Sequence, residues 1–444
     1  MPKKHTLLLI ACCFGFLLHA QQRILGTMSP AEDYKWLIAY QLGPGYQNYV
    51  ADSAVKDGNF TINIPENAKT GVYRLVYAIP QDEFYYDVIY NGKEDIKLSF
   101  SDEEGLRFLH SEENTLYNNY FAAVNALESE IIQFYSSPNT DPSVLSNIHK
   151  ELDQLQKEYE TKSKGLISGH FIAANKPYIP SAHENIETYV QHKKEHYFDA
   201  LDFSDPVLQG SAFLTDKAVN YVFTALPYRK MSAEQLEKEM QANIARLGGI
   251  LQPQDSQFKT ALLGSIWRQL TENNYNSTAD YLYENYLKTL AEETKDTELL
   301  NSIATYNRLR PGAQAPEITW NEGEKTNKLS DLAAANNYLI VFWSSTCSHC
   351  LQQLPELHKK IKDIPNITVL AIGLEDDGEN WEMESAKLPG FTHGIALGKW
   401  ESPYTTLYDI HQTPTYYILD KDKRIIAKPE DYKEAVALLK KNQK

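Results

Sequence analysis

One short segment constrains the fold of this chain more than any other: a continuous apolar run followed closely by two cysteines. The run extends from Tyr338 to Trp343, and Cys347 and Cys350 follow with two residues between them. Such a run is typical of a strand that is buried on both faces. The pattern after the cysteines is helical, so we expect the pair at the point where a strand ends and a helix begins.

The C-terminal region continues this alternation of strands and helices. A connector around Pro311 precedes it, a second apolar run covers residues 367–374, and a strand pair is expected over 415–427. A helix is expected from about Tyr432. Alternating β and α elements with continuous apolar strands predict a central sheet covered on both faces, and we assign residues 308–444 to this α/β domain.

Upstream of residue 308, the spacing of apolar residues changes once and so indicates two further domains. A chain of 444 residues is long enough for several domains. Alternation of apolar and polar residues around Ile62, with turn signals between the runs, predicts an antiparallel β-sandwich over residues 21–110. Apolar residues then recur at helical spacing, with helix starts at Pro142 and at Ser232. A central helical domain is therefore expected over residues 111–307.

Residues 1–20 have the features of an export signal. A basic start around Lys3 precedes an apolar run that is too short to span a membrane, and the small residue Ala20 follows. We expect cleavage near Ala20 and a mature protein in the periplasm or cell envelope. The alternative is a lipoprotein with a lipidated Cys12, and membrane association is expected only through such a lipid or through a partner.

The charge and the cysteine count narrow the possible functions. The net charge of −16 disfavours nucleic acid and anionic lipid as main partners. Two of the four cysteines lie in the predicted signal, so the mature chain keeps only Cys347 and Cys350. A disulfide that closes so short a loop adds little stability to a fold. A zinc site needs more ligands than this pair supplies. We therefore expect redox chemistry, with no metal and no cofactor.

The position of the pair at a helix start has a chemical consequence. Free backbone N–H groups and the positive end of the helix dipole stabilise an anion there, which favours the thiolate of Cys347. Cys350 lies one turn further on and can resolve a mixed disulfide. Between them stands His349, whose protonated ring would stabilise the Cys347 thiolate and raise the reduction potential.

Two prolines complete the pattern. Pro414 directly precedes a predicted strand, where a proline shapes a turn, and a cis bond is one way to do so. Pro355 should interrupt and kink the helix that follows the cysteines. With the Pro311–Pro316 connector and the motif from Trp343 to Cys350, these pieces make residues from about 310 to 444 resemble the TlpA/ResA-like branch of the thioredoxin family.

The resemblance implies a thioredoxin fold and an exchange of disulfides with protein thiols and disulfides of the envelope. It implies that Cys347 attacks, that Cys350 resolves, and that Pro414 is cis and faces the pair. The backbone of Thr413 would pair with an extended substrate segment, and Trp343 belongs to the same motif. The upstream regions resemble poorly characterised domains that precede thioredoxin domains in exported bacterial proteins, which indicates no activity for them.

The chain departs from this family pattern at three positions. Thr346 stands where Trp usually precedes the first cysteine, Val341 where thioredoxins keep a buried acid, and Gln353 where many relatives keep a Glu. The last two changes remove the usual proton acceptor for Cys350. Glu356 is the nearest acid downstream of the pair.

Three functions remain open from the sequence. The first is a thiol–disulfide oxidoreductase of the envelope. The second is a thiol peroxidase, for which Ser344 suits the motif before a peroxidatic cysteine, although Ile340 stands where that motif has a proline. The third is a partner-binding envelope protein in which the upstream domains bind and the cysteine pair is a redox switch.

Overall fold

The computed structural model describes residues 22–137 and 141–442, which form two compact units. The first unit ends at Lys295 and the second begins at Asp296. The predicted export signal at residues 1–20 lies outside the described residues. In the part of the chain that is described, no helix is long and apolar enough to cross a bilayer.

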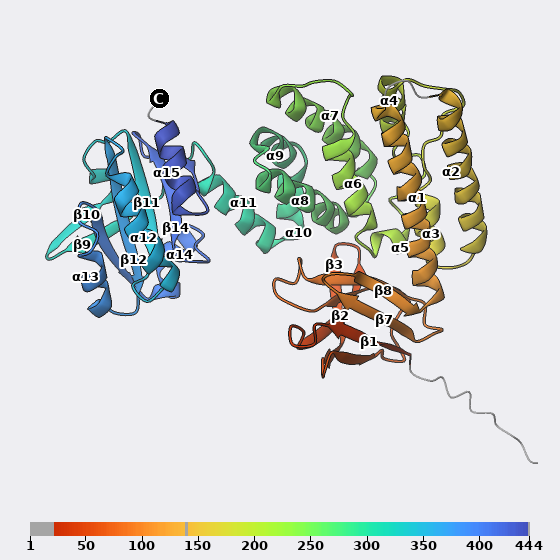
Figure 1. Cartoon of the computed structure of the whole chain (residues 1–444), viewed down its shortest axis with the longest axis horizontal. Coiled ribbons are helices and arrows are strands. Elements are labelled where there is room, and N and C mark those ends of the chain that lie inside the picture. Colours follow the sequence, from red (N-terminus) through yellow and green to blue (C-terminus); the bar gives the residue numbers. More distant parts are fainter. Residues whose placement is uncertain (1–21, 138–140, 443–444) are drawn as a thin grey trace, which may run out of the picture. The chain divides into compact units, whose positions relative to one another are not determined.

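The first unit begins with two four-stranded sheets that share one apolar core (Figure 1). One sheet has the order β4 (Asn59–Asn63), β1 (Arg23–Ser29), β7 (Ile96–Ser101) and β8 (Gly105–His110). The other has the order β3 (Tyr46–Ala54), β2 (Trp36–Gly43), β5 (Gly71–Val76) and β6 (Tyr85–Tyr90). The predicted β-sandwich is confirmed, and the alternation around Ile62 matches the burial of every second residue in β4.

One pairing differs from the antiparallel arrangement expected from the sequence. Strand β1 pairs antiparallel with β4 but parallel with β7. A parallel pair needs a long crossover connection, which here contains all four strands of the other sheet. Such a pairing joins segments far apart in the chain, so local alternation does not reveal it.

The rest of the first unit is helical, as predicted. The N-cap Asp141 accepts from the backbone N–H of Ser143, and Ser232 forms the expected capping box with Gln235. A π-helical turn at Tyr283–Leu287 separates the last two helices of this unit. In chain order the helices are α1 (Glu112–Ser136), α2 (Pro142–Lys162), α3 (Ser168–Ala174), α4 (Ile186–Glu195), α5 (Pro206–Gln209), α6 (Phe213–Thr224), α7 (Ala233–Leu251), α8 (Ser256–Glu272), α9 (Asn276–Leu282) and α10 (Lys288–Thr294).

A buried amide joins the sandwich to the helices. The side chain of Asn114, in the first turn of α1, accepts from the backbone N–H of Ile89 at 2.7 Å and donates to its carbonyl at 2.8 Å. Ile89 lies in β6, so the side chain of Asn114 makes the two backbone hydrogen bonds to this residue that a neighbouring strand would otherwise make. Because both groups are buried, this pair fixes the start of α1 against the sheet.

The second unit is built around a five-stranded mixed sheet, and the predicted C-terminal α/β fold is confirmed. Its order is β13 (Thr392–Leu397), β12 (Ile367–Glu375), β11 (Asn337–Trp343), β14 (Thr415–Asp420) and β15 (Ile425–Ala427). A hairpin of β9 (Thr319–Glu322) and β10 (Lys325–Lys328) forms a separate small sheet. The helices are α11 (Thr297–Leu309), α12 (Ser348–Ile361), α13 (Glu379–Ser385), α14 (Pro403–Leu407) and α15 (Tyr432–Lys441), with single 3₁₀ turns at Leu329–Asp331 and Lys399–Glu401.

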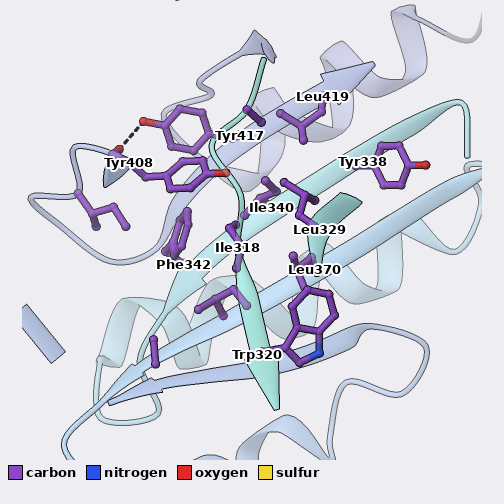
Figure 2. Close-up of a cluster of buried hydrophobic side chains, with 14 of the residues drawn as sticks. Ile318, Trp320, Leu329, Tyr338, Ile340, Phe342, Leu370, Tyr408, Tyr417 and Leu419 are labelled. Carbon is purple, nitrogen blue, oxygen red and sulfur yellow. Dashed lines mark hydrogen bonds between the residues drawn. The ribbon is translucent and has the colours of Figure 1, made fainter. Parts of the chain in front are cut away.

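Both faces of the central strand β11 are buried, as its continuous apolar sequence predicts. Figure 2 shows one face, where Tyr338, Ile340 and Phe342 pack with Trp320 of β9 and with Tyr417. The hydroxyl of Tyr417 donates to the backbone carbonyl of Tyr408 at 2.6 Å, so this buried polar group has a partner.

On the opposite face of β11, side chains from α12 and α15 cover Leu339, Val341 and Trp343. Helix α12 follows β11 directly and contains Pro355. The helix continues through Pro355 to Ile361, so this residue does not end it, and the expected kink at Pro355 stays a prediction. The two cysteines therefore lie at the start of an unbroken helix at the edge of the sheet where β11 ends.

Candidate active site

Cys347 lies between the strand and the helix and forms the N-cap of α12. Its Sγ accepts a hydrogen bond from the backbone N–H of Cys350 at 3.3 Å, in the place where a Ser or Asp oxygen commonly caps a helix. The backbone N–H of Cys347 donates to the carbonyl of Ser344 at 3.1 Å, which closes the turn after β11. The sulfur is thus held against the unsatisfied N–H groups of the helix start.

The two thiols have different environments. Both cysteines are free, and Cys347 is half-buried, whereas Cys350 is 0% exposed. Cys350 packs in the same core cluster as Trp343 and Tyr416 on the α12 face of the sheet. Of these two thiols, only that of Cys347 is accessible to solvent.

The peptide bond between Thr413 and Pro414 is cis, and this segment lies against the cysteine pair. The thiol of Cys347 donates to the carbonyl of Thr413, with an S–O distance of 3.3 Å. The structure therefore brings Thr413, which is distant in the sequence, to the pair of Cys347 and Cys350.

The pKa values of the two thiols move in opposite directions. Burial raises the pKa of Cys347, but hydrogen bonds from the Thr413 side chain, the Cys350 thiol and the backbone N–H groups of Cys350 and His349 outweigh it, so the net pKa is lowered. Burial raises the pKa of Cys350 to about 12. At neutral pH the thiolate therefore forms at Cys347, and the thiolate is the nucleophile.

The other two predicted supporting residues occupy contrasting places. His349 is exposed, and its backbone N–H, rather than its ring, is among the groups that lower the pKa of Cys347. The role of the His349 ring stays a prediction. Trp343 is 1% exposed and packs in the cluster that contains Cys350, so it forms part of the apolar wall around that thiol.

The structure shows the contacts of the residues that differ from the family pattern, and of the nearest downstream acid. Val341 is buried in the core cluster, and the side-chain carbonyl of Gln353 accepts from the hydroxyl of Tyr416 at 3.1 Å. The carboxylate of Glu356 pairs with Lys359 at 2.7 Å. Gln353 and Glu356 are therefore engaged with groups other than Cys350.

Sequence reasoning missed Glu375, a buried acid at the end of β12. It is 3% exposed, and it accepts from the backbone N–H of Ser345 at 2.5 Å and from the hydroxyl of Ser344 at 3.2 Å. Ser344 and Ser345 begin the turn that leads to Cys347, so Glu375 holds this turn in place. A signal was available, because β12 is parallel to β11 and the carboxyl ends of parallel strands meet at one edge of a sheet.

Within residues 22–137 and 141–442, no group of three or more His, Cys, Asp or Glu side chains is arranged to hold a metal ion.

One family model and several solved structures match part of this chain. Residues 336–425 match a family model described as thioredoxin-like. A thioredoxin-like protein from Bacteroides caccae is 18% identical over 60% of this chain and 96% of that chain, with a TM-score of 0.39. A domain of a possible thiol-disulfide isomerase from Cytophaga hutchinsonii is 30% identical over 30% of this chain and 94% of its own length, with a TM-score of 0.28. The search of curated proteins gave no significant match.

The difference in thiol acidity predicts selective alkylation. When the reduced protein is treated briefly with iodoacetamide at mildly acidic pH, Cys347 should be labelled first, because its lowered pKa gives it the larger thiolate fraction. Peptide mass spectrometry identifies the labelled residue, and the Cys347→Ser variant should take up little label under the same conditions. Preferential labelling of Cys350 would overturn the assignment.

The contacts of Glu375 predict a positioning role. Glu375→Ala removes the acceptor for the buried N–H of Ser345 and should lower the free energy of unfolding by about 1–3 kcal/mol. The same change should slow alkylation of Cys347, since the turn before it loses its support. Glu375→Gln keeps one carbonyl oxygen for Ser345 and should restore most of both properties.

Urea unfolding and the pH dependence of Cys347 alkylation measure the two effects of Glu375 separately. If Glu375→Ala changes stability but leaves the alkylation profile of Cys347 unaltered, Glu375 is a structural residue only.

Proposed function

Since residues 336–425 belong to the thioredoxin-like family, we propose that this chain is an exported thiol–disulfide oxidoreductase whose reactive pair is Cys347 and Cys350. The observation that carries the proposal is the contrast between the two thiols. One is accessible and has a lowered pKa, and the other lies buried one turn away with a pKa of about 12. A nucleophile and a resolving thiol need this difference.

In the reducing direction the reaction proceeds in two exchanges. The Cys347 thiolate attacks one sulfur of a substrate disulfide, the substrate S–S bond breaks, and the departing substrate thiolate takes up a proton. Cys350 then loses its proton and attacks Sγ of Cys347. This step releases the second substrate thiol and leaves a Cys347–Cys350 disulfide. Two electrons pass from the pair to the substrate, and the reverse sequence oxidises a dithiol substrate.

The segment at Thr413 and Pro414 is the proposed substrate platform. Pro414 has no N–H and is buried, whereas Thr413 is half-buried and its carbonyl lies 3.3 Å from the attacking sulfur. An extended substrate segment that pairs with the backbone of Thr413 would bring its own sulfur to Cys347. Main-chain pairing of this kind is independent of the substrate sequence.

His349 is proposed to tune the potential of the pair. It follows Cys347 by two positions at the helix start, and it is exposed to solvent. A positive ring near the sulfur stabilises the thiolate, and therefore the reduced form, which raises the reduction potential.

The proposed location is the periplasm or cell envelope, with envelope protein thiols and disulfides as substrates. The support is the basic start, the short apolar run and the small residue Ala20 at the N-terminus. Membrane association is proposed only through a lipid on Cys12 or through a partner.

Turnover of a model disulfide tests the proposed activity. The protein should accelerate reduction of insulin by dithiothreitol, and Cys347→Ser should return the rate to that of dithiothreitol alone, because no nucleophile remains. Cys350→Ser should instead trap a 1:1 mixed disulfide between Cys347 and the substrate, which mass spectrometry detects. The same trap applied to an envelope extract names the physiological substrates.

Each other outcome supports a different function. Rapid consumption of hydrogen peroxide without insulin turnover would show a thiol peroxidase. A pair that oxidises and reduces reversibly, yet turns over neither insulin nor peroxide, would show a redox switch in a binding protein. Either result would overturn the proposed oxidoreductase.

A further inference from the structure

A cavity lies in the helical part of the first unit, whereas the cysteine pair belongs to the second unit. Its volume is about 490 Å³. It is bordered by the end of α2, by α3 and by the loop before α5, and α3 packs against both of these helices (Figure 1). Small-molecule sites usually have volumes of about 300–1,000 Å³ and often lie between helices.

Hydrogen bonds hold two walls of this cavity in place. The carboxylate of Glu113, which is 2% exposed, accepts from the backbone N–H of Ile167 at 3.2 Å and of Ser168 at 2.8 Å. It thereby fixes the turn that leads into α3. Asp205 caps α5, and one of its carboxylate oxygens lies 2.6 Å from Nδ1 of His170 in α3. The cavity is therefore preformed, which lowers the free-energy cost of binding a ligand.

Two uncharged polar groups of the lining lack partners. Ser163 is 1% exposed, and its hydroxyl forms no hydrogen bond with any described residue. In the neutral ring of His170, the contact of Nδ1 with Asp205 places the proton on that nitrogen. Nε2 is then an acceptor, and none of the described residues donates to it. Since buried polar groups usually have partners, a ligand that donates hydrogen bonds suits this lining.

The charges of the lining are mainly negative. The lining has one ammonium group, that of Lys164, and three carboxylates, those of Glu160, Asp202 and Asp205. Only Asp205 is paired, with His170, and within the described residues neither of the other two carboxylates forms an ion pair. Hydrogen bonds from Ser204 lower the pKa of Asp202, so this carboxylate is ionised at neutral pH. A cationic ligand therefore suits the cavity better than an anionic one.

The arrangement of these groups favours an organic cation over a metal ion. Among the described residues, no three His, Cys, Asp or Glu side chains are placed to hold one metal ion. Glu160 comes from α2, and Asp202 comes from the loop before α5. The lining also includes apolar side chains, those of Leu166, Ala173 and Leu208. Separate carboxylates combined with apolar side chains match a molecule whose ammonium groups are joined by methylene groups.

We propose that this cavity binds a small aliphatic polyamine, with ammonium groups on Glu160 and Asp202 and methylene groups against the apolar side chains of the lining. The hydroxyl of Ser163 and Nε2 of His170 accept further hydrogen bonds from the same ligand. The net charge of the chain, −16, favours the approach of such a cation. The site belongs to the first unit, so the inference does not rest on the proposed redox function.

Isothermal titration calorimetry of the full chain with spermidine tests the proposal. Spermidine should bind at one saturable site, and an excess of Mg²⁺ should not displace it, because a compact ion cannot reach both carboxylates. Neutral hexanediol, which lacks the ammonium groups, should not bind. The double variant Glu160→Gln/Asp202→Asn should weaken spermidine binding about ten-fold, as expected when two partly exposed ion pairs are lost.

Two further variants locate the effect. Glu158→Gln/Asp199→Asn removes the same number of charges from exposed residues outside the lining, with side-chain exposures of 55% and 65%, and should bind as the wild type does. Ala173→Phe places a ring in the cavity without changing its charge and should abolish binding. Circular dichroism and the midpoint of thermal unfolding confirm that each variant is folded.

The following results would overturn the inference. Spermidine that does not bind, or that Mg²⁺ displaces at equal charge, would show that the cavity has no specific affinity for a polyamine. Equal binding by the double variant and its matched control would place any bound spermidine elsewhere. A lysine derivative blocked at both its α-amino and carboxyl groups should bind much more weakly than spermidine. If it binds as tightly, the cavity takes a lysine side chain and the assignment to a polyamine is wrong.

Discussion

The proposed chemistry depends on one local interaction, the hydrogen bond from the backbone N–H of Cys350 to the sulfur of Cys347. It places an anion-stabilising donor at the start of a helix whose dipole already favours negative charge there. Because the same sulfur caps the helix, the nucleophile and the element that activates it cannot move independently. The pKa of Cys347 is lowered by hydrogen bonds with Thr413, with the Cys350 thiol and with the backbone N–H groups of Cys350 and His349, whereas burial raises the pKa of Cys350.

Other contacts within the second unit hold Cys347 and the start of α12 in this position. Strand β11 is buried on both faces. Its packing therefore positions the residue at its end, from which the turn to Cys347 starts. Glu375, at the end of the parallel neighbour β12, accepts from two groups of this turn. The carbonyl of Thr413, in the segment just before β14, contacts the sulfur of Cys347. Segments at the ends of three adjacent strands of one sheet thus contribute to a site that only a few side chains line.

Features set by local sequence were predictable, and features set by contacts between distant segments were not. The apolar run before Cys347, the helix start at the pair and the capping box at Ser232 each follow from residues a few positions apart. The parallel pairing of β1 with β7 and the contacts of the Glu375 carboxylate instead join segments that lie far apart in the chain. The sequence signal at Pro355 does not fix the end of α12, because the helix contains this proline and runs on to Ile361.

A glutathione redox titration of the Cys347–Cys350 pair tests the central claim most directly, because stabilisation of the Cys347 thiolate stabilises the reduced form. The account predicts a potential inside the span from about −270 mV for thioredoxin to about −120 mV for the oxidant DsbA, with a more negative value for His349→Ala. A wild-type potential at or below that of thioredoxin, or a pair that forms no disulfide, would contradict it.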